Sequence, residues 1–206
     1  MTAKDLTYIH RFLPPTMPGR PPMLLLHRTG GNENDLIAAA KRVAPGSALL
    51  AVRGNVLEAG KPRFFRRVAK GQFDIDDLKR RTDELANFIA KMRNTYDLAA
   101  PVAFGFSNGA NIAWSLVMRH PHALRAAVLM RPYLAYDPRP VARLDGISVL
   151  VIAGRLDTTV PPARADELPL LLSEAGARVA LKWAEAGHDF SIDDEKIASD
   201  WIEHLG

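Results

Sequence analysis

The chain has 206 residues, 48% of them hydrophobic, which is enough for one substantial core and does not require a second. It contains no cysteine, so disulfides and thiolate metal sites are excluded. The net charge of +4 is spread along the chain without an interleaving of aromatic and basic residues, so no nucleic-acid partner is expected. We therefore predict one domain over residues 1–206.

The first ten residues, MTAKDLTYIH, lack the basic region and apolar stretch of a secretory signal. No apolar run in the sequence approaches the length of a membrane span. We therefore expect a cytoplasmic protein that has no membrane partner.

Apolar runs of strand length alternate with segments of helical period along most of the chain. The runs predict strands over residues 23–27, 48–52, 101–106, 126–130, 147–154 and 178–183. The periodic segments predict helices over residues 32–44, 76–96, 108–120 and about 193–205, with an interrupted helix over 162–176. Asp74 is the expected N-cap of the second helix. Continuously apolar strands separated by helices indicate a mostly parallel sheet covered by helices on both faces, so the fold class is α/β.

Two segments between these elements are irregular. Residues 53–67 form a loop punctuated by proline and glycine, and residues 131–146 form the only irregular stretch available to cover a site. No insertion is long enough to be a separate lid domain.

The segment GFSNGAN, residues 105–111, follows a predicted strand and opens a predicted helix. Ser107 stands between Gly105 and Gly109, as the serine does in a nucleophile elbow, where the flanking positions must be small. The backbone N–H of Asn108 would then point towards a substrate. The spacing of one serine between two glycines also arises by chance. The interpretation as a nucleophile elbow therefore depends on the position of Ser107 at the end of a predicted strand.

Two further strand ends supply a base and an acid. Asp157 follows the strand over 147–154, and His188 follows the strand over 178–183. An aspartate before proline is more often a turn or cap residue, and a single histidine is more often structural. Together with Ser107, however, they stand in the order Ser, Asp, His at successive strand ends, which favours a catalytic triad.

The segment HRTGGNEND follows the first apolar strand, and it is either an oxyanion loop or an ordinary glycine-rich turn. In the first interpretation, the backbone N–H of Thr29 pairs with that of Asn108 to bind an oxyanion.

The sequence resembles the phospholipase/carboxylesterase group of the α/β-hydrolases, which includes small bacterial carboxylesterases and acyl-protein thioesterases. The resemblance covers nearly the whole chain and is carried by five segments in the family's order, LLLHRTGGNENDL, VRGNVLEAGKPRFFRR, GFSNGANIA, GRLDTTVP and AGHDF. It implies an α/β-hydrolase fold with Ser107, Asp157 and His188 as the triad. It also implies hydrolysis of carboxylic esters through an acyl-enzyme, without metal or cofactor.

One position departs from the family, which usually has His-Gly where this sequence has His27-Arg28. If the backbone there requires φ > 0, arginine adds strain that would misalign Thr29 and weaken the esterase. Alternatively, Arg28 lies over the pocket and attracts acyl groups that bear a carboxylate, with help from Arg53 or Arg66. These two belong to a basic cluster that consists of Arg53, Lys61, Arg63, Arg66, Arg67 and Lys70. The simpler interpretation is that Arg28 and the cluster are solvated surface.

Phe64 and Phe65 are candidates for the lining of an acyl pocket, although aromatic residues at such positions are more often core. The predicted substrate is a small soluble ester, since no lid is present to favour aggregated lipid. Acyl-thioester hydrolysis and a non-catalytic binding or regulatory role are the alternatives. An exposed apolar helix face would serve a homodimer, which periodicity alone does not distinguish from a stripe that faces the core.

Overall fold

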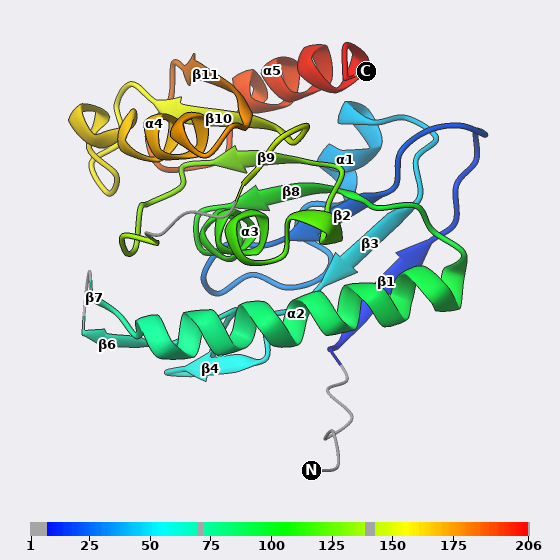
Figure 1. The fold of residues 1–206 in the computed structure, drawn as a ribbon, viewed down its shortest axis with the longest axis horizontal. Helices are drawn as coiled ribbons and strands as arrows, with labels where there is room; N and C mark the ends of the chain where they lie inside the picture. The colour runs from blue at the N-terminus through cyan, green and yellow to red at the C-terminus, as the bar shows by residue number, and fades with distance from the viewer. Residues whose placement is uncertain (1–7, 70–71, 139–142, 206) are drawn as a thin grey trace.

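The computed structural model describes residues 8–69, 72–138 and 143–205. Seven strands form a central sheet in the order β1-β3-β2-β8-β9-β10-β11 (Figure 1). Their bounds are β1 His10–Leu13, β2 Met23–Leu26, β3 Leu49–Val52, β8 Val102–Phe106, β9 Ala126–Met130, β10 Ser148–Gly154 and β11 Arg178–Ala184. Only the pair of β1 and β3 is antiparallel, and the other neighbouring pairs of this sheet are parallel. The predicted α/β class and mostly parallel sheet are confirmed.

The apolar runs are continuous because the inner strands are covered on both faces. Every residue of β2, β3, β8, β9 and β10 is buried. The two edge strands are only partly buried, and β1 was not predicted because its four residues HRFL carry no clear apolar pattern.

Helices cover both faces of the sheet (Figure 1). Helices α1 (Ile37–Val43) and α5 (Ile192–Glu203) pack on one face, in a core that includes Met23 and Leu25. Helices α2 (Ile75–Tyr96), α3 (Asn108–Arg119) and α4 (Glu167–Glu174) pack on the other, in a core that includes Leu24 and Leu26. The alternation of side chains along β2 therefore divides its leucines between two cores.

The sequence predicted the N-cap of α2 correctly, but it placed the start of α1 too early. Asp74 caps α2, since its side chain accepts a hydrogen bond from the backbone N–H of Asp77. The first helix begins at Ile37 rather than at residue 32, because Asn32 accepts the N–H of Asn34 in a local turn. Short 3-10 turns, η1 (Pro121–Ala123) and η2 (Pro162–Arg164), precede β9 and α4.

The predicted loop over residues 53–67 contains one hairpin, and a second hairpin begins at its last residue. Strand β4 (Val56–Glu58) pairs with β5 (Lys61–Arg63), and β6 (Arg67–Ala69) pairs with β7 (Gln72–Phe73). The β4–β5 turn places both Ala59 and Gly60 at positive φ, 49° and 75°, as a two-residue hairpin turn requires. Strands of two or three residues are too short for an apolar alternation to reveal them.

Three parts of the sequence predictions fall outside the described ranges, namely residues 1–7 of the amino-terminal segment, Lys70 of the basic cluster and residues 139–142 of the irregular stretch 131–146. Within residues 8–69, 72–138 and 143–205, no helix has the length and apolar character needed to cross a membrane.

Candidate active site

Ser107 occupies a strained turn between β8 and α3. Its φ is 52° and its ψ is −110°, a conformation that residues with side chains rarely adopt. Its backbone N–H donates to the carbonyl oxygen of Met130 at 2.9 Å, which ties the turn to the end of β9. The turn therefore presents a half-buried serine at the carboxyl edge of the sheet.

The two glycines around Ser107 are required by close approach. A Cβ at Gly105 would lie 2.7 Å from the carbonyl oxygen of Gly109, and one at Gly109 would lie 2.0 Å from the carbonyl oxygen of Leu26. Both distances are far below van der Waals contact. The small residues of the motif thus let α3 start directly against β8 and β2.

The structure brings Ser107, His188 and Asp157 together. The Ser107 Oγ lies 2.9 Å from Nε2 of His188, and Nδ1 of His188 lies 2.8 Å from Oδ2 of Asp157. His188 comes from the loop between β11 and α5, and Asp157 comes from the loop after β10. Parallel neighbouring strands place these loops side by side, because their carboxyl ends share one edge of the sheet.

Asp157 determines which atom donates in each hydrogen bond between Ser107, His188 and itself. Its side chain is 1% exposed, and its Oδ1 accepts the backbone N–H groups of Thr159 and Val160 at 2.7 and 2.9 Å. A carboxylate only accepts, so Nδ1 of His188 donates to it, and Nε2 is then free to accept the Ser107 hydroxyl proton. His188 is 25% exposed, so water reaches this imidazole from the open side.

The loop that carries Thr29 is held by His27. The Nδ1–H of His27 donates to the carbonyl oxygen of Arg28 at 2.6 Å, and Nε2 accepts the backbone N–H of Gly54 at 2.9 Å. Burial lowers the pKa of the His27 imidazole, which keeps it in the neutral form that this pair of bonds requires. The Thr29 hydroxyl in turn accepts a hydrogen bond from Arg63 at 2.8 Å.

Asn108 is buried at the first position of α3. The first N–H groups of a helix have no partner within the helix, so the backbone N–H of Asn108 is a donor available at the serine. The Asn108 side chain accepts the backbone N–H of Phe64 through Oδ1 at 2.8 Å. Asn108 therefore joins the nucleophile turn to the segment that follows β5.

The three arginines considered for substrate binding each face a carboxylate. Their partners are Asp189 at 2.8 Å for Arg28, Glu33 at 2.8 Å for Arg53, and Asp74 at 2.9 Å for Arg66. The Arg28 and Asp189 side chains are 52% and 90% exposed, so this pair lies in solvent beside His188. The ion pairs favour the surface interpretation of these arginines over carboxylate binding.

The suspected backbone strain at Arg28 is absent. Among the described non-glycine residues, φ is positive only at Ala59, Asp97, Ser107 and Arg131. The φ of Arg28 is not positive, so an arginine adds no backbone strain at this position. The condition under which Thr29 would be misaligned is therefore not met.

Phe64 and Phe65 are fully buried within the core on the α2 side of the sheet. The Phe64 ring packs against His27 at 4.8 Å between ring centres, and the Phe65 ring meets Phe73 at 5.3 Å. Their positions match the core interpretation rather than that of an open acyl pocket.

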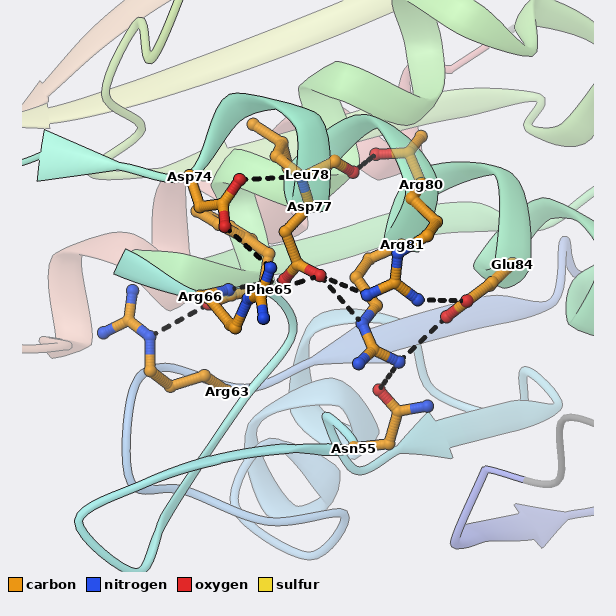
Figure 2. A network of polar contacts seen from close by, with 11 residues as sticks. Asn55, Arg63, Phe65, Arg66, Asp74, Asp77, Leu78, Arg80, Arg81 and Glu84 are labelled. Carbon is orange, nitrogen blue, oxygen red and sulfur yellow. Dashed lines mark hydrogen bonds and ion pairs between the residues drawn. The ribbon is translucent and has the colours of Figure 1, made fainter. Parts of the chain in front are cut away.

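A polar network around the buried Asp77 fixes the segment that carries these rings (Figure 2). Asp77 on α2 has a fully buried side chain, and its carboxylate accepts the backbone N–H of Arg66 at 2.8 Å. It is also paired with Arg80 and, at 3.6 Å, with Arg81, which reaches Asn55. Figure 2 shows Asp77 between these arginines and the chain beside Phe65. The start of α2 thus holds the chain that contacts Asn108.

Sequence reasoning missed Arg63 and Arg131 as parts of the site. Both side chains are almost fully buried, at 3% and 0% exposed, although arginine is usually a surface residue. Burial lowers the pKa of Arg63 to about 10, so its guanidinium keeps its charge at neutral pH beside Thr29. No local pattern in the sequence distinguishes these two arginines from the solvated ones.

Known proteins share this architecture over almost the whole chain. A family model described as alpha/beta hydrolase fold matches residues 65–146. MhqD of Bacillus subtilis (strain 168), whose name places it among the hydrolases, is 38% identical over 183 residues, which are 88% of this chain and 92% of MhqD.

Two solved carboxylesterases superpose closely on the chain. The Bacillus cereus carboxylesterase has a TM-score of 0.94 at 40% identity, over 98% of this chain and 96% of that one. The Mesorhizobium loti carboxylesterase has a TM-score of 0.90 at 32% identity, over 98% and 97% of the two chains. With its sheet order, its strained serine turn and these relatives, the chain belongs to the α/β-hydrolase family and is a hydrolase.

Proposed function

We propose that this hydrolase is a carboxylesterase that cleaves small soluble carboxylic esters through an acyl-enzyme on Ser107. The observation that carries the proposal is the continuous hydrogen-bond chain from Ser107 through His188 to Asp157, with distances of 2.9 and 2.8 Å. Serine alone is a weak nucleophile, and an oriented imidazole within hydrogen-bond distance is what activates it.

In the first half-reaction, the Ser107 oxygen attacks the ester carbonyl carbon while Nε2 of His188 takes the hydroxyl proton. The carbonyl oxygen becomes an oxyanion, which accepts hydrogen bonds from the backbone N–H groups of Asn108 and Thr29. The tetrahedral intermediate collapses, and the alcohol leaves with the proton from His188. Asp157 keeps the imidazole in the tautomer with hydrogen on Nδ1 and stabilises its positive charge.

In the second half-reaction, water replaces the alcohol. His188 takes a proton from the water as its oxygen attacks the acyl carbon, and the same two N–H groups bind the new oxyanion. Collapse returns the proton to Ser107 and releases the carboxylic acid. The partial exposure of His188 supports this step, since water must reach the imidazole.

The proposed preference for small esters is supported by the segments that follow the strands at the carboxyl edge of the sheet, where Ser107 lies. In the described part of the chain, the segments that follow the strand ends at this edge are hairpins, turns and irregular loops, and none forms a helical lid. Phe64 and Phe65 are enclosed in the core and do not offer a wide apolar channel. The proposed localisation remains the cytoplasm, and the proposed chemistry uses no metal or cofactor.

The test is hydrolysis of p-nitrophenyl esters from acetate to palmitate by the wild type and Ser107→Ala in parallel. We expect activity that falls with chain length and is lost in the variant, together with labelling of the wild type at Ser107 by a fluorophosphonate. A folded wild type with neither ester turnover nor labelling would overturn the proposal. Turnover of acyl thioesters well above that of matched oxygen esters would replace the ester with a thioester as the substrate.

A further inference from the structure

Arg131 stands directly after β9 in an unusual conformation. Its φ is 52°, in the left-handed region that favours glycine, and its side chain is completely buried. Glycine would adopt this backbone without strain, so the arginine side chain is what the position requires. Strained residues persist where the surrounding structure over-determines them, and they concentrate at functional sites.

The Arg131 guanidinium forms a two-point ion pair with Asp194 on α5. Its Nη1 lies 2.6 Å from Oδ1 of Asp194, and its Nη2 lies 3.1 Å from Oδ2. The Asp194 side chain is only 1% exposed. A buried ion pair of this kind contributes little net stability compared with apolar packing, but it defines geometry sharply.

The same guanidinium also holds the loop that carries His188. Nε of Arg131 donates to the carbonyl oxygen of Gly187 at 2.9 Å, one residue before His188. The fit is close, since a Cβ on Gly154 would lie 2.8 Å from that Nε and 2.6 Å from the Gly187 oxygen. Arg131 therefore fixes the entry of the chain into His188.

Asp194 fixes the exit of the chain from the same loop. It accepts hydrogen bonds from the backbone N–H and the hydroxyl of Ser191, at 2.8 and 2.9 Å, in the capping box that starts α5. His188 thus lies in a loop whose two ends, Gly187 and Ser191, are bound to the two members of one ion pair.

The backbone around Arg131 also contacts Ser107 and β10, the strand that leads to Asp157. Met130, the preceding residue, accepts the N–H of Ser107 at 2.9 Å, and the backbone N–H of Arg131 donates to Ile152 on β10 at 2.9 Å. Arg131 and Asp157 also line one small cavity. Met130 and Arg131 together therefore contact Ser107, the strand that leads to Asp157 and the loop that carries His188.

We infer that Arg131 is a positioning residue, which holds the His188 imidazole in line between Asp157 and Ser107 through Gly187 and Asp194. The inference rests on the proposed function for its kinetic consequence, but the position of the imidazole is itself measurable. The Arg131 and Asp194 side chains are both buried, so we expect their effect on turnover rather than on substrate binding.

The test compares Arg131→Lys and Asp194→Asn with the wild type. Lysine keeps the charge but lacks the planar fork, so it cannot hold both Asp194 oxygens and the Gly187 carbonyl together. Asparagine keeps an acceptor for Ser191 but carries no charge, so it replaces the ion pair with a neutral hydrogen bond to Arg131. We expect kcat to fall about 10- to 100-fold in each variant, with KM within about twofold, because a displacement near 1 Å is enough for such a loss.

Glu195→Gln is the matched control. Glu195 neighbours Asp194 on α5 and is also buried, but its two-point ion pair is with Arg42 on α1 rather than with Arg131. Its substitution perturbs the same helix but leaves the Arg131–Asp194 ion pair in place. We therefore expect kcat to stay within about twofold of the wild type.

A spectroscopic readout separates positioning from stability and from the proposed reaction. The proton between His188 and Asp157 should give a low-field proton NMR signal that is absent from His188→Ala. This signal should broaden or vanish in folded Arg131→Lys or Asp194→Asn and persist in Glu195→Gln. If ester turnover is absent from the wild type, the proposed function fails while the signal still tests the inference.

An unchanged kcat and an unchanged signal in a folded variant at either position would overturn the inference and leave Arg131 as a structural residue. If Arg131→Lys does not fold, Asp194→Asn decides between the same two outcomes. In the His188→Ala background, Arg131→Lys should cause no further loss of residual activity, and a full additional loss would also contradict the positioning role.

Discussion

The backbone N–H of Phe64 donates to the side-chain oxygen of Asn108 at 2.8 Å, so the chain after β5 is bound to the residue that directly follows Ser107. The two residues are 44 positions apart in the sequence. Both are buried, and the bond holds the first turn of α3 against the segment that the Asp77 network anchors.

Asn108→Ala should therefore reduce both stability and activity. It leaves the buried Phe64 N–H without an acceptor, which costs about 1–3 kcal/mol in the free energy of unfolding. The backbone N–H of residue 108 remains, so some turnover should persist. Urea unfolding and kcat measure the two effects, with Asn87→Ala, at an exposed position of α2, as the control. Equal stability of both variants would contradict the role of this bond.

Gly109→Ala should destabilise the fold by at least about 2 kcal/mol, because the new Cβ would meet the Leu26 carbonyl oxygen at 2.0 Å and push α3 away from β2. Gly187→Ala is the matched stability control, since the nearest atom to its new Cβ is 3.5 Å away. Thermal unfolding of both variants tests the prediction. A Gly109→Ala protein as stable as Gly187→Ala would show that the turn can relax.

Protonation of His27 should lower the free energy of unfolding in mild acid. Because burial lowers its pKa in the folded state, the unfolded chain binds more protons as the pH falls below about 6.5. The stability contribution is therefore complete above that pH and is lost as the pH falls towards the folded pKa. In His27→Gln, the free energy of unfolding should decline less steeply between pH 6.5 and pH 5, by up to about 1.4 kcal/mol per pH unit.

His204→Gln is the control for this pH series, because its shift has the opposite sign. The backbone carbonyl and carboxylate of Asp200 raise the pKa of His204, which is exposed at the end of α5. Its contribution is present at low pH and is lost as the pH rises through the folded pKa. Its removal should therefore leave the acid decline as steep or make it steeper, and a shallower decline would contradict the assignment to His27.

Arg28 should have little influence on the choice between charged and neutral esters. Asp189 neutralises it, and an exposed ion pair of this kind contributes about 0.2–1 kcal/mol. Arg28→Ala should leave the ratio of hydrolysis rates for a half-acid ester and its neutral analogue unchanged. Asp189→Asn frees the guanidinium and should raise that ratio. A lower ratio in Arg28→Ala would instead establish carboxylate binding by Arg28.

The amino-acid sequence determined the class of the fold and the order of the site loops. Apolar runs such as those of β8 and β10 are continuous because both faces of these strands are buried. This pattern can be recognised in one amino-acid sequence without the structure. Parallel strands bring their carboxyl ends to one edge, so the order of Ser107, Asp157 and His188 predicted the proximity that the structure shows. Their catalytic roles rest on the proposed mechanism.

The tertiary structure decided what each arginine does and how the short hairpins form. Arg28, Arg63 and Arg131 are the same residue type in sequence, yet one is solvated and two are buried. Their partners include Asp189, Thr29 and Asp194, which are between 34 and 161 residues away. Strands β4 to β7 are too short to carry a period. Contacts between distant residues leave no local pattern, so only the folded chain reveals them.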